Sequence, residues 1–166
     1  MIFERHGLAN IPFALPKNTA EAEKFLLENG EIIVKPKAGL GAHDIRRITS
    51  TDELKDIHYP KYIFEKYIAG KEMRYLVLND EIIAVHHSSY GESVEYDRYL
   101  ERISYTEDKW DEDLCAQALK ISDVLSLNFC AVDFMITPNG ETYILEVNTV
   151  PGLKWFHAPS SGPAVD

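Results

Sequence analysis

Residues 129–148 read FCAVDFMITPNGETYILEVN, and this stretch decides the expected fold. Two runs of strand-forming residues flank Asn139-Gly140, a pair typical of two-residue hairpin turns. With that turn, Asp133 lies directly opposite Glu146, and Asn148 shares their face because side chains alternate along a strand. The other face is apolar and is predicted to belong to the core; it carries Val132, Phe134, Leu145 and Val147.

The paired carboxylates of this hairpin point to a cation. Two opposed carboxylates repel each other, and a bound cation is the simplest way to offset that repulsion. Two carboxylates and an amide oxygen are hard ligands suited to Mg²⁺, and such sites usually leave positions for substrate phosphates. Asp133, Glu146 and Asn148 are therefore candidate metal ligands. The alternative is a solvated pair of acids, because neighbouring exposed carboxylates are common.

Upstream of the hairpin, a second candidate site follows a short strand. The β-branched run Ile32-Ile33-Val34 ends at Lys35, and a lysine at the end of a buried strand needs a counter-charge or a route to water. The loop that follows contains Gly39, Gly41 and His43, and its glycines let backbone amides approach an anion. A snorkelling lysine before an ordinary turn is the alternative interpretation. No Gly-Lys-Ser/Thr follows the glycines, which excludes a Walker A loop.

The third segment, residues 65–74, reads EKYIAGKEMR. If its end is a strand, Glu72 and Arg74 lie on one face of that strand. An arginine in such a position can stabilise the oxygens of a phosphoryl group during transfer. The alternative is a surface Glu/Arg pair, which contributes little to stability.

The remaining pattern predicts an α+β fold in two lobes, with helices on antiparallel sheets. Ala69-Gly70 is the expected hinge between a small lobe, residues 1–68, and a large lobe, residues 69–166. Residues 89–109 show no apolar period and are expected to form a long polar loop, and the C-terminal end is also expected to be loop. The His86-His87 pair is interpreted as a pair of surface residues, because spacing places no carboxylate beside it.

Composition limits the classes of function. The 166 residues include 17 basic and 27 acidic ones, with a formal net charge of −10. This charge argues against non-specific nucleic-acid binding, which depends on basic residues, and against an anionic membrane surface. We expect neither a signal peptide nor a transmembrane segment, because the N-terminal residues are charged and the apolar runs are short. With only two cysteines, we expect a cytoplasmic protein with free thiols.

Taken together, the three segments resemble the ATP-grasp family. Residues 32–36 with their glycine loop are similar to the family's phosphate-gripping strand, residues 65–74 to its interlobe segment, and residues 132–135 and 144–152 to its magnesium hairpin. Within the family, the chain looks most similar to carboxylate–amine ligases of the ribosomal-protein glutamate ligase and D-alanine ligase type. The resemblance implies a two-lobed fold with a nucleotide between the lobes.

The resemblance also implies roles for the motif residues. Lys35 binds the α and β phosphates of ATP beside the loop of Gly39, Gly41 and His43, and Arg74 contacts the γ-phosphate or an acyl phosphate. The hairpin's candidate ligands hold Mg²⁺, with Mn²⁺ as an alternative metal. The other implied nucleotide contacts are to adenine, from Glu65, Lys66, Met135 and the backbone of Tyr67 and Ile68, and to the ribose, from Glu72.

The implied reaction joins a carboxylate, on a small molecule or a peptide, to an amino acid or other amine. It proceeds through an acyl phosphate and releases ADP and phosphate. The alternatives are a nucleotide-binding module that needs another domain or chain, and a phosphotransferase of the same family. The family usually has an N-terminal α/β domain, which this chain starts too late to contain. We therefore expect an excised domain or a minimal member of the family, with a homodimer as a further expectation. Ala131 stands two residues before Asp133, where D-alanine ligases have an arginine.

Overall fold

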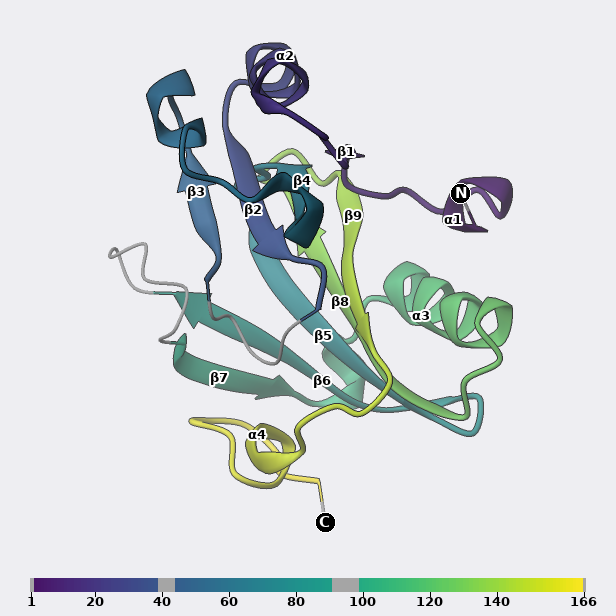
Figure 1. Cartoon of the computed structure of the whole chain (residues 1–166). Helices are drawn as coiled ribbons and strands as arrows, with labels where there is room; N and C mark the ends of the chain where they lie inside the picture. The colour runs from purple at the N-terminus through teal and green to yellow at the C-terminus, as the bar shows by residue number, and fades with distance from the viewer. Residues whose placement is uncertain (1, 39–43, 91–98, 166) are drawn as a thin grey trace. The chain divides into compact units, whose positions relative to one another are not determined.

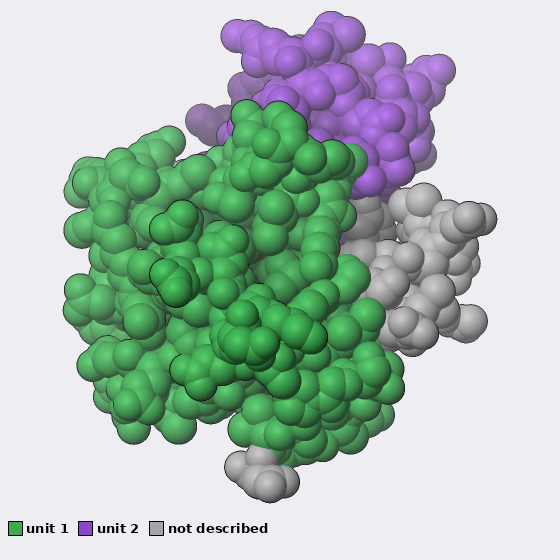
Figure 2. Space-filling view, turned by 180° about the vertical axis from the view of Figure 1, so that it is seen from behind, with its two compact units in different colours: residues 1–10, 69–94, 98–166 green, residues 11–68, 95–97 purple. Residues whose placement is uncertain are grey.

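The computed structural model describes residues 2–38, 44–90 and 99–165 (Figure 1). These residues form two compact units, which are coloured separately in Figure 2. Unit 1 takes residues 2–10, 69–90 and 99–165, and unit 2 takes residues 11–38 and 44–68. Each unit has its own antiparallel sheet and its own hydrophobic core, so the predicted α+β class is confirmed.

Unit 2 is built on a four-stranded antiparallel sheet with the strand order β1-β4-β2-β3. The strands are β1 (Phe13–Ala14), β2 (Ile32–Pro36), β3 (Arg46–Ile48) and β4 (Tyr62–Lys66). The helices are α2 (Thr19–Asn29) and two short 3₁₀ helices, η1 (Thr51–Leu54) and η2 (Tyr59–Lys61).

The core of unit 2 lies between α2 and one face of this sheet. Ala22 and Leu26 of α2 pack with Ile32, Val34 and Phe64 of the sheet. Because strand side chains alternate, Lys35 belongs to the other face.

Unit 1 is built on a five-stranded antiparallel sheet with the order β7-β6-β5-β8-β9. The strands are β5 (Lys71–Leu78), β6 (Glu81–Tyr90), β7 (Tyr99–Tyr105), β8 (Phe129–Ile136) and β9 (Thr142–Asn148). The helices are α1 (Ile2–Arg5), the 3₁₀ helix η3 (Glu107–Lys109), α3 (Glu112–Val124) and α4 (Lys154–His157).

The helix α3 covers one face of the five-stranded sheet (Figure 1). It begins at Asp111, whose side chain accepts a hydrogen bond from Leu114 N at 3.0 Å. Leu8 joins the core under α3, so the first residues pack with unit 1 and not with the small lobe to which the sequence assigned them. Among the described residues, no helix is both long and apolar enough to cross a membrane.

Two segments predicted to be loop contain regular structure. The strand β7 lies within the predicted polar loop, and its residues Arg102 and Ser104 are buried on the sheet face opposite α3. Because both are polar, the strand carries no apolar alternation that a sequence pattern can detect. Near the C-terminus, α4 buries Phe156 against Leu76 and neighbouring small residues of the same face.

The turn between β8 and β9 is longer than predicted. Thr137 donates its backbone N–H to Glu141 O at 2.9 Å, which leaves residues 138–140 in the loop instead of Asn139-Gly140 alone. Gly140 has φ 86°, the left-handed conformation found at the end of three-residue hairpin loops. Near the turn, cross-strand partners are therefore shifted by one residue from the predicted register.

A β-bulge removes this shift before the polar residues are reached. The register changes between Asp133 and Phe134, where Leu145 is the extra residue of β9. Asp133 consequently pairs with Glu146, as predicted, but Ile144 and not Leu145 lies in the core. The predicted pair is confirmed, although the turn from which it was derived is wrong.

Candidate functional site

The sheet face opposite α3 carries two cross-strand rows of mostly polar side chains. The first row contains Ser104, His86, Arg74, Asp133 and Glu146, and the second contains Arg102, Ser88, Glu72 and Met135. The two rows are two residues apart on each of the four strands that they share, so they lie on one face. They bring together five of the predicted site residues of unit 1, and the sixth, Asn148, lies on the same face of β9.

An ion pair between neighbouring strands forms the centre of the first row. Arg74 Nε lies 2.5 Å from Asp133 Oδ1, and Arg74 Nη2 lies 2.6 Å from Oδ2, so both carboxylate oxygens are engaged. The same Nη2 is 3.4 Å from Glu146 Oε1. Asn148 Nδ2 donates to Asp133 Oδ2 at 3.0 Å and to Glu146 Oε1 at 2.7 Å. The three candidate metal ligands thus lie together, with Arg74 among them.

Burial sets the electrostatics of this pair. The side chain of Asp133 is 1% exposed, whereas those of Arg74 and Glu146 are 13% and 50% exposed. Burial raises the pKa of Asp133 to about 6, against the hydrogen bond and charge of Arg74, which favour the carboxylate. Against the effect of burial, the hydrogen bond and charge of Asp133 raise the pKa of Arg74. The arrangement therefore demands a cation beside Asp133, and Arg74 supplies one.

The second row holds a buried carboxyl at Glu72. Ser88 Oγ donates to Glu72 Oε1 at 3.2 Å, and Arg102 Nη1 lies 4.0 Å from the same oxygen. Burial raises the pKa of Glu72 to about 7, and the charge of Asp133 acts in the same direction. Ser88 and Arg102 were not singled out in the sequence. The only signal for Arg102 is that it alternates with Ile103, which faces the α3 side.

The interpretation of His86 as a surface residue is wrong. Its side chain is 1% exposed, and its ring stacks on Phe156 of α4 with centroids 4.2 Å apart and planes 7° apart. Burial lowers the pKa of His86 to about 3, and the charges of Arg102 and Arg74 add to this effect. His86 is buried because α4 covers this part of the sheet, an element absent from the sequence prediction.

In unit 2, Glu65 supplies a counter-charge for Lys35. Lys35 Nζ lies 2.8 Å from Glu65 Oε1, and both side chains are largely buried. Lys66 N donates to Pro12 O at 2.8 Å, and Tyr67 N donates to Glu31 O at 2.9 Å. A ligand that contacts the backbone at Tyr67 therefore meets its carbonyl and not its N–H.

Other features of unit 2 surround these residues. The Arg47 guanidinium lies 4.0 Å from the ring centroid of Tyr67, and Arg47 Nε donates to Glu31 Oε2 at 2.9 Å. Ile68 is half-buried at the end of this segment. The predicted loop residues Gly39, Gly41 and His43 lie outside the described residues.

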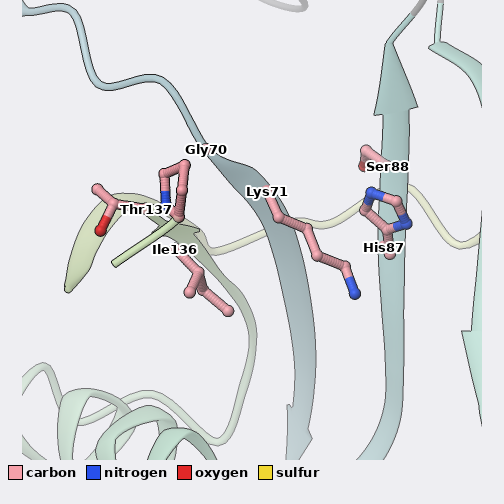
Figure 3. A pocket seen from close by; sticks show the side chains of 7 residues that line it. Gly70, Lys71, His87, Ser88, Ile136 and Thr137 are labelled. Atoms are coloured by element: carbon pink, nitrogen blue, oxygen red, sulfur yellow. The ribbon is translucent and has the colours of Figure 1, made fainter. Parts of the chain in front are cut away.

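A cavity of about 600 Å³ opens on unit 1 (Figure 3). It is lined by Gly70, Lys71, His87, Ser88, Ile136, Thr137 and Pro138. Ser88 belongs to the second row, but Lys71, His87 and Ile136 each adjoin a row residue in sequence and so belong to the α3 face. Lys71 Nζ donates to the hydroxyl of Tyr105, which also faces that side. We therefore place the candidate site on the polar rows and not in this cavity.

The comparisons with known proteins give the family and the fold. The family model of the ATP-grasp domain matches residues 3–151. The chain belongs to the ATP-grasp family. D-alanine–D-alanine ligase of Aquifex aeolicus is 27% identical over 158 residues, covering 82% of this chain and 54% of that protein. Coenzyme γ-F420-2:α-L-glutamate ligase of Methanococcus maripaludis is 24% identical over 173 residues, covering 95% of this chain and 59% of that protein.

A solved ATP-grasp structure shows the same fold. It is the ATP-grasp ligase PsnB complexed with a phosphomimetic variant of its minimal precursor, Mg and ADP. The TM-score is 0.76 at 16% identity, covering 95% of this chain and 50% of that chain. This chain thus spans about half the length of the ATP-grasp relatives it matches. The recognition of the family from three sequence segments is confirmed, and the roles of single residues stay predictions.

Proposed function

We propose that this chain binds ATP and a divalent cation in an ATP-dependent ligase that joins a carboxylate to an amine and releases ADP and phosphate. The observation that carries the proposal is the convergence of Arg74, Asp133 and Glu146, with Asn148 beside them, on one face of an ATP-grasp sheet. Both curated relatives are named as ligases, and the PsnB structure holds Mg and ADP, which supports this choice of reaction and cofactor. The acceptors are a small-molecule or peptide carboxylate and an amino acid or other amine, and the proposed location is the cytoplasm.

The residues present fit Mg²⁺. The proposed metal ligands are two carboxylates and an amide. Among the described residues, no three His, Cys, Asp or Glu side chains gather as a metal-binding group. Carboxylate and amide oxygens are the donors that Mg²⁺ accepts, and it usually keeps waters and substrate phosphates as its other ligands. In the metal-free chain, Arg74 supplies the positive charge beside Asp133. When bound, the metal supplies charge neutralisation and orientation for the phosphates.

The remaining predicted residues bind and orient the nucleotide. In unit 2, Lys35 binds the α and β phosphates and the Tyr67 carbonyl accepts a hydrogen bond from adenine, beside Glu65, Lys66 and Ile68. In unit 1, Met135 packs on adenine and Glu72 accepts hydrogen bonds from the ribose hydroxyls. Met135 and Glu72 are cross-strand partners, which supports their contact with adjoining parts of one ligand.

Arg74 is the proposed catalytic residue. Its planar guanidinium already engages the two oxygens of a carboxylate, the same fork geometry with which arginine engages a phosphoryl group. In the reaction, it stabilises negative charge on the phosphoryl group as that group moves to the substrate carboxylate. The amine then displaces phosphate from the acyl phosphate.

The test is a screen for amine-dependent ADP and phosphate release with ATP, Mg²⁺, amino acids and carboxylate peptides. Arg74→Ala should lower the rate by about a hundred- to a thousandfold, as the loss of one transition-state donor does. ATP affinity should fall far less, because contacts made in the transition state appear in turnover. Arg46→Ala, which removes an exposed arginine of unit 2, is the matched control. A rate for Arg74→Ala equal to that of the control contradicts the catalytic role.

A nucleotide-binding module is the second candidate function, and Ala131 is the observation that favours it. The resemblance to D-alanine ligases implies an arginine at this position, but Ala131 is buried in an apolar cluster with Leu76, Ala84 and Phe156. In a module, Arg74→Ala weakens nucleotide affinity, and no acceptor releases phosphate. Turnover with any carboxylate and amine rejects this alternative.

A further inference from the structure

Arg74 occupies the carboxylate oxygens that the proposed function gives to the metal. Both oxygens of Asp133 are within 2.6 Å of a guanidinium nitrogen, and Glu146 Oε1 is 3.4 Å from the same guanidinium. Asn148 presents its amide nitrogen, and not its oxygen, to both carboxylates. Both carboxylates of the proposed metal site are therefore engaged by hydrogen-bond donors of this chain.

A guanidinium and a divalent cation compete for these oxygens. The two positive charges repel, and Asp133 and Arg74 are shielded from the water that would screen that repulsion. Arg74 and the Asn148 amide also occupy three of the roughly four lone-pair sites of the Asp133 carboxylate. Metal binding is therefore weakened while Arg74 holds Asp133, and coordination by Asn148 requires its amide to turn the oxygen inward.

A nucleotide phosphate can replace Asp133 as the partner of the Arg74 guanidinium. It offers two oxyanions in the fork geometry that the Asp133 carboxylate offers, so the guanidinium exchanges one bidentate partner for another. Departure of Arg74 leaves Asp133 and Glu146 without their shared cation, and two facing carboxylates favour the binding of a metal. Each ligand thus improves the binding of the other, as linkage requires.

We propose that Arg74 excludes the divalent cation from Asp133, Glu146 and Asn148 until a nucleotide phosphate takes the guanidinium, so that metal and nucleotide load together. This inference rests on the proposed function and deepens it. It gives Arg74 a role in metal binding that is separate from any effect on the rate of reaction, because it concerns the protein before a substrate is present.

The experiment measures Mn²⁺ binding to the nucleotide-free chain, from the EPR signal of free Mn²⁺. Wild-type protein should bind Mn²⁺ weakly, and Arg74→Met should bind it about ten- to a hundredfold more tightly, because a competing charged hydrogen-bond pair is gone. Arg74→Lys, which keeps the charge but loses the fork, should lie between them. Arg47→Met is the matched control, since it removes an arginine that pairs with Glu31 in unit 2, and it should leave Mn²⁺ binding unchanged.

A double variant and a second readout keep the result interpretable. Asp133→Asn in the Arg74→Met background should abolish the tight binding, which assigns it to this site. If Arg74→Met fails to fold because two carboxylates face each other, Arg74→Lys carries the comparison. Thermal unfolding with and without Mn²⁺ gives an independent readout, in which Mn²⁺ should stabilise the Arg74 variants more than the wild type.

The outcomes separate this inference from the proposed function. Equal Mn²⁺ affinity in wild type and both Arg74 variants overturns the exclusion by Arg74. If Asp133→Asn still removes Mn²⁺ binding in that case, or if ATP still promotes it, the proposed metal site stands. Absence of Mn²⁺ binding in every variant, with and without ATP, overturns both.

Discussion

Glu72 is a buried carboxyl whose protonation differs between the folded and unfolded chain. Burial raises its pKa from 4.5 to about 7, so the folded chain holds this proton more tightly. The stability gained from that proton is fully present below pH 4.5 and is lost as the pH rises through about 7. In metal-free buffer, we expect the free energy of unfolding of the wild type, relative to Glu72→Gln, to fall by about 1–3 kcal/mol between pH 5 and pH 8.

Urea denaturation of both proteins across this pH range measures the difference. Gln cannot ionise but keeps the size of Glu, so the effects of groups that do not interact with Glu72 cancel in the comparison. Glu28→Gln, which changes an exposed carboxyl of α2, is the control and should follow the wild type. Parallel curves for wild type and Glu72→Gln contradict the pKa shift.

At the scale of elements, the short helix α4 seals one end of the polar rows. Phe156→Ala removes a buried ring and should lower the free energy of unfolding by about 3–5 kcal/mol. Because Phe156 covers His86, the same change should raise the pKa of His86 from about 3 toward its ordinary value. Denaturation measures the first effect, and NMR titration of the His86 ring measures the second. Trp155→Ala, at a more exposed position of the same helix, should leave that titration near the wild-type value.

The junction of β5 and β8 depends on Gly70. A Cβ added there would lie 2.4 Å from Ile136 O, and both atoms belong to the backbone or are attached to it, so one strand must move. We expect Gly70→Ala to lower the free energy of unfolding by about 1–3 kcal/mol. Gly152→Ala is the matched control, because a Cβ there meets no heavy atom within 4 Å. Equal denaturation midpoints for the two variants would show that the paired strands β5 and β8 accommodate the added methyl group without a loss of stability.

The features that the sequence predicted depend on neighbouring residues, whereas most of those that it missed depend on contacts between residues distant in the chain. The Asp133–Glu146 pair was predicted from local turn chemistry, and two departures from it, a longer loop and a bulge, cancelled at Asp133. The strand β7 was missed because Arg102 and Ser104 face a polar surface, so the usual apolar alternation is absent. The burial of His86 depends on α4, which is distant in the chain and too short to carry a helical pattern. The Lys35–Glu65 pair and the Arg74–Asp133 pair are likewise products of strand pairing.

For the whole molecule, the proposed function connects residues of two units that have separate cores. Lys35 lies in unit 2 and Asp133 in unit 1. In the nucleotide-free protein, the effects of Lys35→Met and Asp133→Asn on the free energy of unfolding should add, because the two residues belong to units with separate cores.

The stability that Mg²⁺ and ATP add to the folded chain shows whether a residue of each unit contributes to ATP binding. A ligand that binds only the folded chain raises its stability by mass action, and each tenfold loss of affinity removes about 1.4 kcal/mol at saturating concentrations. Lys35→Met removes a charged contact to phosphate and should weaken ATP binding about ten- to a hundredfold, while Lys55→Ala, at an exposed position of the same unit, should not. Asp133→Asn should abolish the part of the thermal shift that needs Mg²⁺. If the thermal shift of Lys35→Met with Mg²⁺ and ATP equals that of the wild type, Lys35 is a structural partner of Glu65 and does not contact the nucleotide.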